Sequence, residues 1–566
     1  LNNAMSNTPI SPDHQRQGSV QTWVTSQWKL LPTPGQLSMK INKENKLDHA
    51  YSLRGKLLFQ MNDATSLLIV GDYLNREDNG ATFAPYPGSP KTTIAYQGIG
   101  PSSGNRYDSY SGTAGRTVFK GGGIAATFRS DFGFAELVSI SAYRKFDFAF
   151  RYDLDGAPSV IVDSDAVGNG RMYSQELQLV SDDSGPLKWV TGVYYFNYRQ
   201  GYDYFNRDFR NGPAINGGTY RFNALNRNAT LDTFEKSESI APFAQADFEV
   251  VQGTTITAGL RYTYEKRTLT GGGQRTNGAG VVAARTFNNP PALVAKKVTW
   301  RLAINQKLSD DVMIFASNSR GFKSGGFNIS NPGSVSYLPE QLDDWEIGLK
   351  SQFWNRRITF NATGFYYKYK NVQVSQFITP PGGTPAQIVT NGAGAKIYGV
   401  DIDLSARVFN GLTLTGGLSL IHPEFTDYPN APLTIDKTAA AGGGITTAIL
   451  PNAKGKRLPY ARKYGLTGAV DYVTPAFGGN LGVNITATQN GDYYFEADNT
   501  TRQPSYTMLN ASIKVSNASD SLSLRLGVSN LLDEEIFARN VTLASGRLVS
   551  YGVAPREYTL TLGAKF

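Results

Sequence analysis

The stretch Ser521-Leu522-Ser523-Leu524-Arg525-Leu526-Gly527-Val528-Ser529 alternates without exception between apolar residues and small or charged residues. A period of two places the three leucines on one face of an extended strand and Arg525 on the other. Two further stretches, Val400 to Val408 and Gly411 to Leu420, show the same alternation. We therefore expect an all-β chain whose strands each have one apolar face.

The connections between the strands distinguish between kinds of all-β fold. From Tyr51 onward about nineteen strands can be counted, and their connections alternate between short and long. The short connections include Gln252-Gly253, Ser309-Asp310, Trp354 to Arg356, Phe409 to Gly411, and Asn517 to Asp520. The long ones include Asn79 to Arg116, Arg207 to Leu231, Leu269 to Ala295, Ile378 to Ala395, and Asn430 to Lys456. A Greek-key sandwich has no reason to keep this alternation, whereas bacterial transmembrane barrels have short periplasmic turns and long extracellular loops.

The end of the chain indicates how such a barrel is oriented. Tyr558, Leu560, Leu562 and Phe566 fall on one face of a last strand. A last strand that ends in an aromatic residue resembles the signal read by the outer-membrane assembly machinery, which implies a periplasmic C-terminus and extracellular long loops. Because a Lys or Arg at the lipid midplane costs about 2 to 4 kcal/mol, we expect Arg525 to face the lumen. The sequence thus predicts an antiparallel, up-and-down transmembrane β-barrel.

Composition agrees with a barrel and excludes several other classes of protein. The mean hydropathy of −0.31 and the 12% of aromatic residues suit strands that alternate, and no apolar run reaches the roughly 18 to 20 residues of a membrane helix. With 0 cysteines, disulfides and thiolate metal sites are excluded. The net charge of +9 is dispersed, so we expect no nucleic-acid partner, and the basic side chains suit a lumen or anionic lipopolysaccharide.

The histidines give no indication of a metal site or of catalysis. His14, His49 and His422 are far apart in the sequence and lack ligand-spaced partners. We therefore expect neither a resident metal or cofactor nor an enzyme.

Several segments resemble the barrel of TonB-dependent outer-membrane receptors, and they follow that family's order. They are Ser174 to Ser181 with Trp189 to Phe196, Ser319 to Asn328, Pro339-Glu340 with Trp345 to Lys350, Gly455 to Pro459, Asn530 to Asp533, and Pro555 to Tyr558. The resemblance covers residues 51–566, which we assign to a TonB-dependent-receptor-like barrel. Residues 1–50 are left as an unassigned leader or as incomplete first strands. The family barrel has twenty-two strands, and the family's plug domain and TonB box are not recognisable in this sequence.

The resemblance implies a function in nutrient uptake. Members of the family lie in the bacterial outer membrane, bind a scarce ligand such as a ferric siderophore, and import it with energy delivered by TonB and its inner-membrane complex. We expect a monomer with these partners. Two alternatives remain open: a passive, porin-like channel, and a surface receptor on which a phage or a host molecule docks.

Three clusters of rings and cations near strand ends are candidate binding residues. They are Arg106, Tyr107 and Tyr110; Tyr204, Phe205, Arg207, Phe209 and Arg210; and Arg320, Phe322 and Lys323. Guanidinium groups and rings suit an anionic or aromatic ligand, and they also suit lipopolysaccharide phosphates.

Two other sets of residues are given a structural role. The stretches Phe365 to Tyr367 and Tyr493 to Phe495 are expected in the aromatic girdle at the membrane interface. The triplet Gly121 to Gly123 is expected to form a bend.

Overall fold

The computed structural model describes residues 47–80, 83–87, 113–153, 162–182, 185–209, 228–276, 286–287, 289–330, 336–378, 386–436, 445–543 and 546–565. Among these residues the regular structure consists of strands. No helix in the described ranges is long and apolar enough to cross a membrane.

One large sheet contains most of the strands. Its members are β1 (Leu47–Gln60), β2 (Thr65–Asp78), β4 (Arg116–Asp131), β5 (Ala135–Asp153), β6 (Val162–Ser181), β7 (Leu187–Phe209), β8 (Asn228–Val251), β9 (Thr254–Thr276), β10 (Thr286–Phe287), β11 (Leu293–Ser309), β12 (Val312–Lys323), β13 (Glu340–Phe353), β14 (Ile358–Lys370), β17 (Gly394–Phe409), β18 (Leu412–Asp427), β21 (Tyr464–Ala476), β22 (Gly479–Asn490), β25 (Tyr506–Asn517), β26 (Leu522–Ser529) and β29 (Glu557–Ala564). The remaining strands form small sheets in the long connections: β3 (Ala84–Pro85), β15 (Gln373–Ile378), β16 (Ala386–Asn391), β19 (Pro429–Asp436), β20 (Ile445–Asn452), β23 (Tyr493–Tyr494), β24 (Arg502–Gln503), β27 (Phe537–Leu543) and β28 (Gly546–Tyr551).

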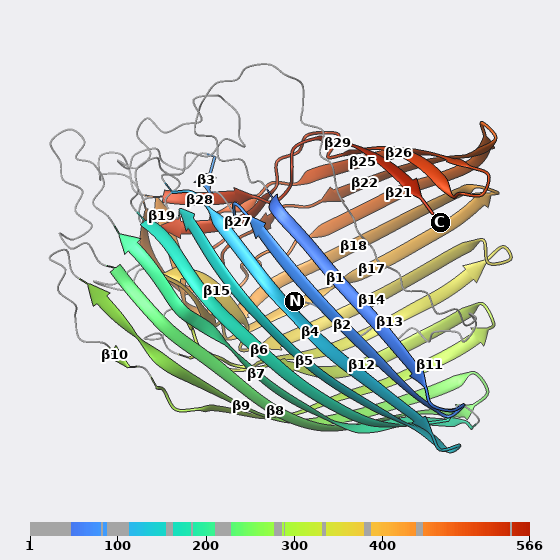
Figure 1. Cartoon of the computed structure of the whole chain (residues 1–566), viewed down its shortest axis with the longest axis horizontal. Coiled ribbons are helices and arrows are strands. Elements are labelled where there is room, and N and C mark those ends of the chain that lie inside the picture. Colours follow the sequence, from blue (N-terminus) through green and yellow to red (C-terminus); the bar gives the residue numbers. More distant parts are fainter. Residues whose placement is uncertain are drawn as a thin grey trace.

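Each long strand of the large sheet pairs antiparallel with the next one in the chain, from β1 and β2 through to β26 and β29. The sheet has 20 strands, and nineteen remain when the two-residue β10 is set aside. Figure 1 shows this sheet curving into an up-and-down barrel wall. The expected all-β fold and the strand number are confirmed. Among the described residues β1 pairs with β2 alone and β29 with β26 alone, so these two strands are the edges of the sheet.

Short and long connections lie at opposite ends of the strands, as expected. The short turns lie on the right of Figure 1, and the small outer strands β10, β15, β19 and β28 lie on the left. The outer ends extend further than the sequence indicated, because β9 continues to Thr276, inside the predicted loop Leu269 to Ala295. At 24 and 23 residues, β8 and β9 are more than twice as long as the roughly 9 to 11 residues that cross a bilayer. The wall is therefore longer than a bilayer crossing needs, and the excess length lies toward the long connections.

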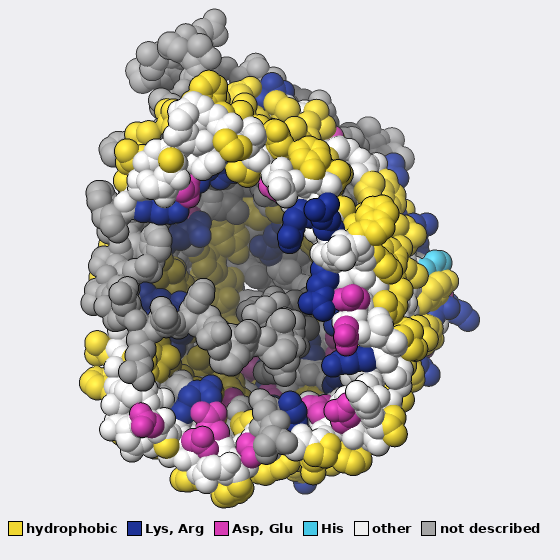
Figure 2. Space-filling view, turned by 90° about the vertical axis from the view of Figure 1, so that its right-hand side faces the viewer, with side chains coloured by type: hydrophobic (Ala, Val, Ile, Leu, Met, Phe, Trp, Pro, Cys, Tyr) yellow, Lys and Arg dark blue, Asp and Glu magenta, His cyan; other side chains and the backbone are white. Residues whose placement is uncertain are grey.

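The two faces of the wall differ as the alternation predicted. Leu522, Leu524 and Leu526 are 60%, 45% and 56% exposed, and they pair with other apolar residues of the outer face. Arg525 lies on the opposite face, where its register partners are Lys514 and Thr561. Figure 2 shows hydrophobic side chains over the outside and charged side chains around the hollow interior.

Aromatic side chains lie at the end of the apolar outer face that is nearer to the long connections. Outward-facing rings occur on successive strands, among them Tyr73, Tyr143, Tyr173, Trp345, Tyr366 and Tyr398. Tyr366 therefore belongs to the girdle, as the sequence indicated. The same prediction was wrong for Phe365 and Tyr367, which lie on the inward face of β14 beside Glu346. It was also wrong for Tyr493 and Phe495, which are 7% and 3% exposed inside a cluster formed by the outer loops.

Candidate ligand-binding site

A ladder of aromatic rings lines the inner face of β5. Phe146, Phe148, Phe150 and Tyr152 share one face of this strand, and the successive ring centroids are 6.4, 6.3 and 5.1 Å apart. The opposite face carries Tyr143, which is 46% exposed toward the outside. Because β5 begins at Ala135 after a short turn, the ladder lies in the extracellular half of the lumen.

Rings from both sides extend the ladder into a surface. Phe119 on β4 stacks on Phe146 at 5.7 Å. On β7, Tyr202 meets Phe148 edge-on at 5.9 Å, and the buried Phe205 meets Phe150 at 6.3 Å. We call these seven residues the inner aromatic wall: Phe119, Phe146, Phe148, Phe150, Tyr152, Tyr202 and Phe205.

Glycines allow the rings of this wall to lie flat against the backbone. A Cβ added at Gly170 would lie 2.3 Å from Cζ of Phe146, and one at Gly168 would lie 2.4 Å from Cζ of Phe148. On the other side of Phe146, a Cβ at Gly121 would lie 2.9 Å from its Cβ. The expected bend at Gly121 to Gly123 was therefore wrong, since these glycines lie inside β4 and leave room for the rings.

A charged cluster faces the lumen on the neighbouring strands β8 and β9. Arg267 donates to Glu235 at 2.8 Å and to Glu265 at 2.5 Å, and the Ser237 hydroxyl also donates to Glu265 at 3.0 Å. Glu235 and Glu265 are buried, so their charges are balanced by Arg267 and by hydrogen bonds rather than by water.

This cluster holds the segment 324–329, which follows β12. The Ser324 hydroxyl donates to Glu265 at 2.6 Å, and the backbone N–H of Phe327 donates to Glu235 at 3.2 Å. Further along, the Asn328 side chain forms two hydrogen bonds with the backbone of Val389 in β16, at 3.1 and 2.7 Å. The segment therefore connects the β8–β9 wall to the β15–β16 hairpin, whose second strand lies inside the predicted loop Ile378 to Ala395.

The outer hairpins pack on one another and enclose a carboxyl group. Tyr493, Phe495, Phe537 and Val549 belong to one buried cluster. Beside it, Glu496 accepts a hydrogen bond from Thr542 at 3.1 Å. Burial, together with the nearby charge of Asp498, raises the pKa of Glu496 to about 7.

An ion pair also joins segments of these outer loops. Arg457 donates to Asp492 at 2.6 Å and lies 4.3 Å from the ring centroid of Tyr494. The guanidinium holds the pKa of Asp492 below its ordinary value, so this pair is charged at neutral pH.

The structure places the sequence-predicted binding residues in different surroundings. Arg106, Tyr107, Tyr110 and Arg210 lie outside the described residues. Arg207 and Phe209 belong to β7, where the backbone of Arg207 pairs with that of Ser164 and Ala229, but their side chains are outside the described part of the structure. Phe205 is 3% exposed within the inner aromatic wall, and Tyr204 is 38% exposed.

The third predicted cluster is divided between the two faces of β12. Arg320 and Phe322 are on the outward face with Ile314, whereas Lys323 is on the inward face. Arg320 lies 4.0 Å from the ring centroid of Trp300 and donates to Asp343 at 2.9 Å. Arg320 is therefore turned away from the lumen.

The sequence analysis missed the ladder on β5, although its signal was visible. Rings alternate with other residues through the stretch Lys145-Phe146-Asp147-Phe148-Ala149-Phe150-Arg151-Tyr152. The assumption that an apolar face meets lipid would turn these rings outward. Beyond Tyr143, however, the outward positions carry Lys145 and Asp147, so the outer face of the strand is no longer apolar there.

Within the described residues there is no group of three or more His, Asp or Glu side chains that could hold a metal ion. His422 stacks on Tyr398 at 4.8 Å and contacts Glu424 at 3.0 Å on the outward face of the wall.

Comparison with known proteins agrees with this geometry. The family model described as TonB dependent receptor-like, beta-barrel matches residues 62–531. The chain belongs to this family. It is a family of receptors and transporters found in Gram-negative outer membranes.

Curated relatives share part of the sequence. The chain is 22% identical to the pesticin receptor of Yersinia enterocolitica over 303 residues, which cover 53% of this chain and 40% of the receptor. It is 28% identical to the ferric-pyoverdine 358 receptor of Pseudomonas putida over 273 residues, covering 48% of this chain and 29% of that protein. The matches thus span less than half the length of these relatives.

Solved structures share the fold. The ferric yersiniabactin uptake receptor FyuA from Yersinia pestis superposes with a TM-score of 0.68 at 17% identity, covering 91% of this chain and 71% of that one. The siderophore receptor PiuA from Acinetobacter baumannii gives a TM-score of 0.66 at 17% identity, covering 91% and 74%.

Proposed function

We propose that this chain forms the barrel of an outer-membrane receptor that imports a ferric siderophore with energy supplied through TonB. The observation that carries the proposal is the inner aromatic wall at the extracellular mouth of a barrel of this family. The names of the relatives, among them a ferric-pyoverdine receptor and a siderophore receptor, support an iron-carrying ligand.

The chemistry of the lumen suits such a ligand. Flat rings with half-buried faces offer stacking partners to an aromatic chelating group. Cations lie on the same inner face, including Arg261, whose guanidinium is 5.5 Å from the ring centroid of Tyr194, and Arg144, which pairs with Asp72 at 2.5 Å. A negatively charged ferric complex would find both rings and guanidinium groups along one wall.

The partners in this proposal follow from the family and from the outer face. The whole receptor would engage TonB and its inner-membrane complex. It would lie as a monomer in the outer membrane, with lipopolysaccharide around its extracellular half. The role is transport, not catalysis.

Binding of ferric siderophores by the full-length receptor tests this function. Cells that lack other iron receptors would express it and be offered a panel of isotope-labelled ferric siderophores. We expect saturable binding of at least one of them. Phe148→Ala should weaken that binding about 3- to 10-fold, the range expected for one aromatic contact.

Tyr143→Ala is the matched control, because Tyr143 lies on the same strand and faces outward. It should leave the affinity unchanged. Entry of many small solutes without saturation, equal in all three proteins, would instead identify a passive channel.

A further inference from the structure

The β27–β28 hairpin, in the connection between β26 and β29, is joined to two other connections above the barrel. Its strand β28 pairs with β3 of the β2–β4 connection, where Val549 lies opposite Ala84. On β27, the guanidinium of Arg539 donates to the side chain of Gln387 in β16 at 2.5 Å. Figure 1 shows β3, β19, β27 and β28 close together at the end of the barrel away from the short turns. The hairpin is therefore fixed to loops that come from distant parts of the wall.

The β3 segment connects the hairpin to the inner aromatic wall. Phe83, directly before β3, is 4% exposed, and its ring centroid lies 6.3 Å from that of Tyr152. Directly after β3, the backbone N–H of Tyr86 donates to the carbonyl of Arg547 at 2.9 Å, and its ring lies 5.9 Å from that of Phe537. Tyr152 is the outermost ring of the ladder on β5. The hairpin thus holds a ring against the outer end of the proposed ligand surface.

The tip of the hairpin contacts Glu496 of the β22–β25 connection. The Thr542 hydroxyl donates to Glu496 at 3.1 Å, and the Asn540 amide donates to that hydroxyl at 3.0 Å. The side-chain carbonyl oxygen of Asn540 is buried and receives no hydrogen bond from the residues that the structure describes. An ionised Glu496 offers only acceptors to this cluster, whereas a protonated Glu496 adds an O–H donor. The polar groups here are therefore better matched when Glu496 carries a proton.

The charges around Glu496 also favour its protonated form. The titratable groups that interact with it, directly or through one neighbour, are Asp498, Arg547, Tyr460, Asp436 and Lys456. Asp498 repels a charge on Glu496. Arg547 of β28 would attract one, but its guanidinium is paired with Asp436 of β19 at 3.0 Å. Burial and the charge of Asp498 together raise the pKa of Glu496 to about 7.

We propose that the β27–β28 hairpin is a proton-controlled lid on the inner aromatic wall, closed while Glu496 is protonated and released when Glu496 is ionised. In the closed arrangement β28 holds β3, and Phe83 covers Tyr152 at the outer end of the wall. Release of the hairpin frees β3 and uncovers that end. The lid is held most firmly below pH 4.5 and is released as the pH rises through 7. It regulates the site of the proposed function, and only the identity of its ligand rests on that function.

Hydrogen exchange of the full-length receptor tests the lid without a ligand. The protection of the amides in residues 84–86 and 546–551 would be measured at pH 5 and pH 8, corrected at each pH for the intrinsic exchange rate. Protection should fall by at least about tenfold between these pH values. It should fall by at most about 70-fold, the limit set by a pKa of about 7 against the ordinary 4.5. Protection in β26 should stay constant.

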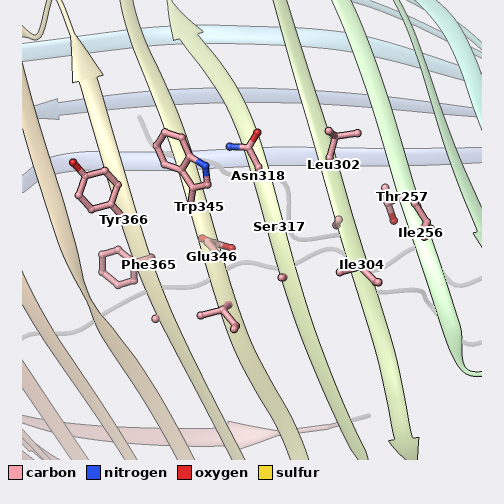
Figure 3. A pocket seen from close by; sticks show the side chains of 14 residues that line it. Ile256, Thr257, Leu302, Ile304, Ser317, Asn318, Trp345, Glu346, Phe365 and Tyr366 are labelled. Carbon is pink, nitrogen blue, oxygen red and sulfur yellow. The ribbon is translucent and has the colours of Figure 1, made fainter.

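Two variants separate the effect of Glu496 from a general effect of pH. Glu496→Gln imitates the protonated carboxyl and should keep the hairpin protected at both pH values. Glu346→Gln is the matched control, because Glu346 also accepts a hydrogen bond from a hydroxyl, that of Tyr367 at 3.2 Å, but lies on β13 in the barrel wall. Figure 3 shows Glu346 there, beside Trp345, among the residues that line a groove in the wall. This control should keep the pH dependence of the wild type.

The rate of siderophore association gives a second readout. The rate for the wild type would be divided by that for Glu496→Gln at the same pH, so that effects of pH on the siderophore itself cancel. This ratio should rise about tenfold from pH 5 to pH 8, because only the wild-type lid opens over this range.

The outcomes distinguish the lid from the proposed function. Protection of the hairpin that does not change with pH in the wild type, or that still changes in Glu496→Gln, would overturn the lid even if a siderophore binds. A constant ratio of association rates would overturn it as a control of access. Protection that changes as expected without binding of any siderophore would support the lid and count against the proposed function. The wild-type measurement decides the question even where a variant fails to assemble.

Discussion

Leu524→Arg tests the assignment of the two faces of the wall, on which every statement about lumen and lipid depends. Leu524 is 45% exposed on the outer face, opposite Val515 and Leu562. An arginine there would place its guanidinium in hydrocarbon. The cost is about 2 to 4 kcal/mol at the midplane and about 0 to 1 kcal/mol near an interface.

The structure gives the depth of the site and hence the size of the effect. Taking Leu522 as the periplasmic edge, a rise of about 3.3 Å per residue and a tilt of about 40° place Leu524 about 5 Å into the hydrocarbon and Leu526 about 10 Å. The cost should therefore increase from Leu522→Arg through Leu524→Arg to Leu526→Arg, with Leu524→Arg near 2 kcal/mol, an estimate between the two limits.

The assay is urea unfolding of the barrel reconstituted in thin lipid vesicles, together with the yield of assembled protein in cells. Ser523→Arg is the matched control, because Ser523 points inward opposite Gly563 and Ser516. It should change the unfolding free energy by less than about 1 kcal/mol. Equal costs for Leu524→Arg and Ser523→Arg, or a cost that does not increase with depth, would refute the assignment.

Three further predictions concern the lumen and the outer loops. Gly170→Leu should displace the ring of Phe146, because the added Cβ would lie 2.3 Å from Cζ of that ring, and it should therefore weaken siderophore binding. Gly55→Leu is the control: a Cβ at this position meets no atom within 4 Å, so siderophore binding should not change. Glu235→Gln should reduce the hydrogen-exchange protection of residues 324–329 about tenfold, since a bond to a charged group contributes about 1.5 kcal/mol, and unchanged protection would refute the role of Arg267 and Glu235. The folded loops raise the pKa of Glu496 from its ordinary 4.5 to about 7, so they are stabilised by the protonated carboxyl. This stabilisation is complete below pH 4.5 and is lost as the pH rises through 7. The hydrogen-exchange protection of Tyr493–Gln503 should thus fall between pH 5 and 8, by at most about 3 kcal/mol. Glu496→Gln should remove this dependence of the protection on pH.

The membrane-spanning part of the fold could be predicted from the sequence because lipid imposes a simple rule. Leu522, Leu524 and Leu526 had to share the outer face, and two-residue turns such as Gln252-Gly253 left the chain no alternative to antiparallel neighbours. Both expectations agree with the register.

The same rule fails where lipid ends. Above the girdle either face of a strand meets water or other loops, so apolar character no longer reports direction. For this reason the inward direction of the rings from Phe146 to Tyr152 could not be predicted from the sequence. The same holds for Arg320, assigned from sequence to a ligand cluster, which lies on the outer face against Trp300.

Contacts between distant loops could not be read from the sequence at all. Tyr493 and Phe495 have the composition of a girdle, yet they are buried against Phe537 and Val549, which come from another connection. Likewise, nothing local indicates that Ser324 would bond to Glu265. Such pairings depend on which long loops meet above the barrel, which strand periodicity does not encode.

The central claim is tested most directly by uptake of a labelled ferric siderophore through the full-length receptor, in otherwise identical strains with and without TonB. The proposed function predicts saturable uptake that disappears when TonB is deleted, while surface binding of the same ligand persists. Uptake that continues unchanged without TonB and does not saturate would contradict it.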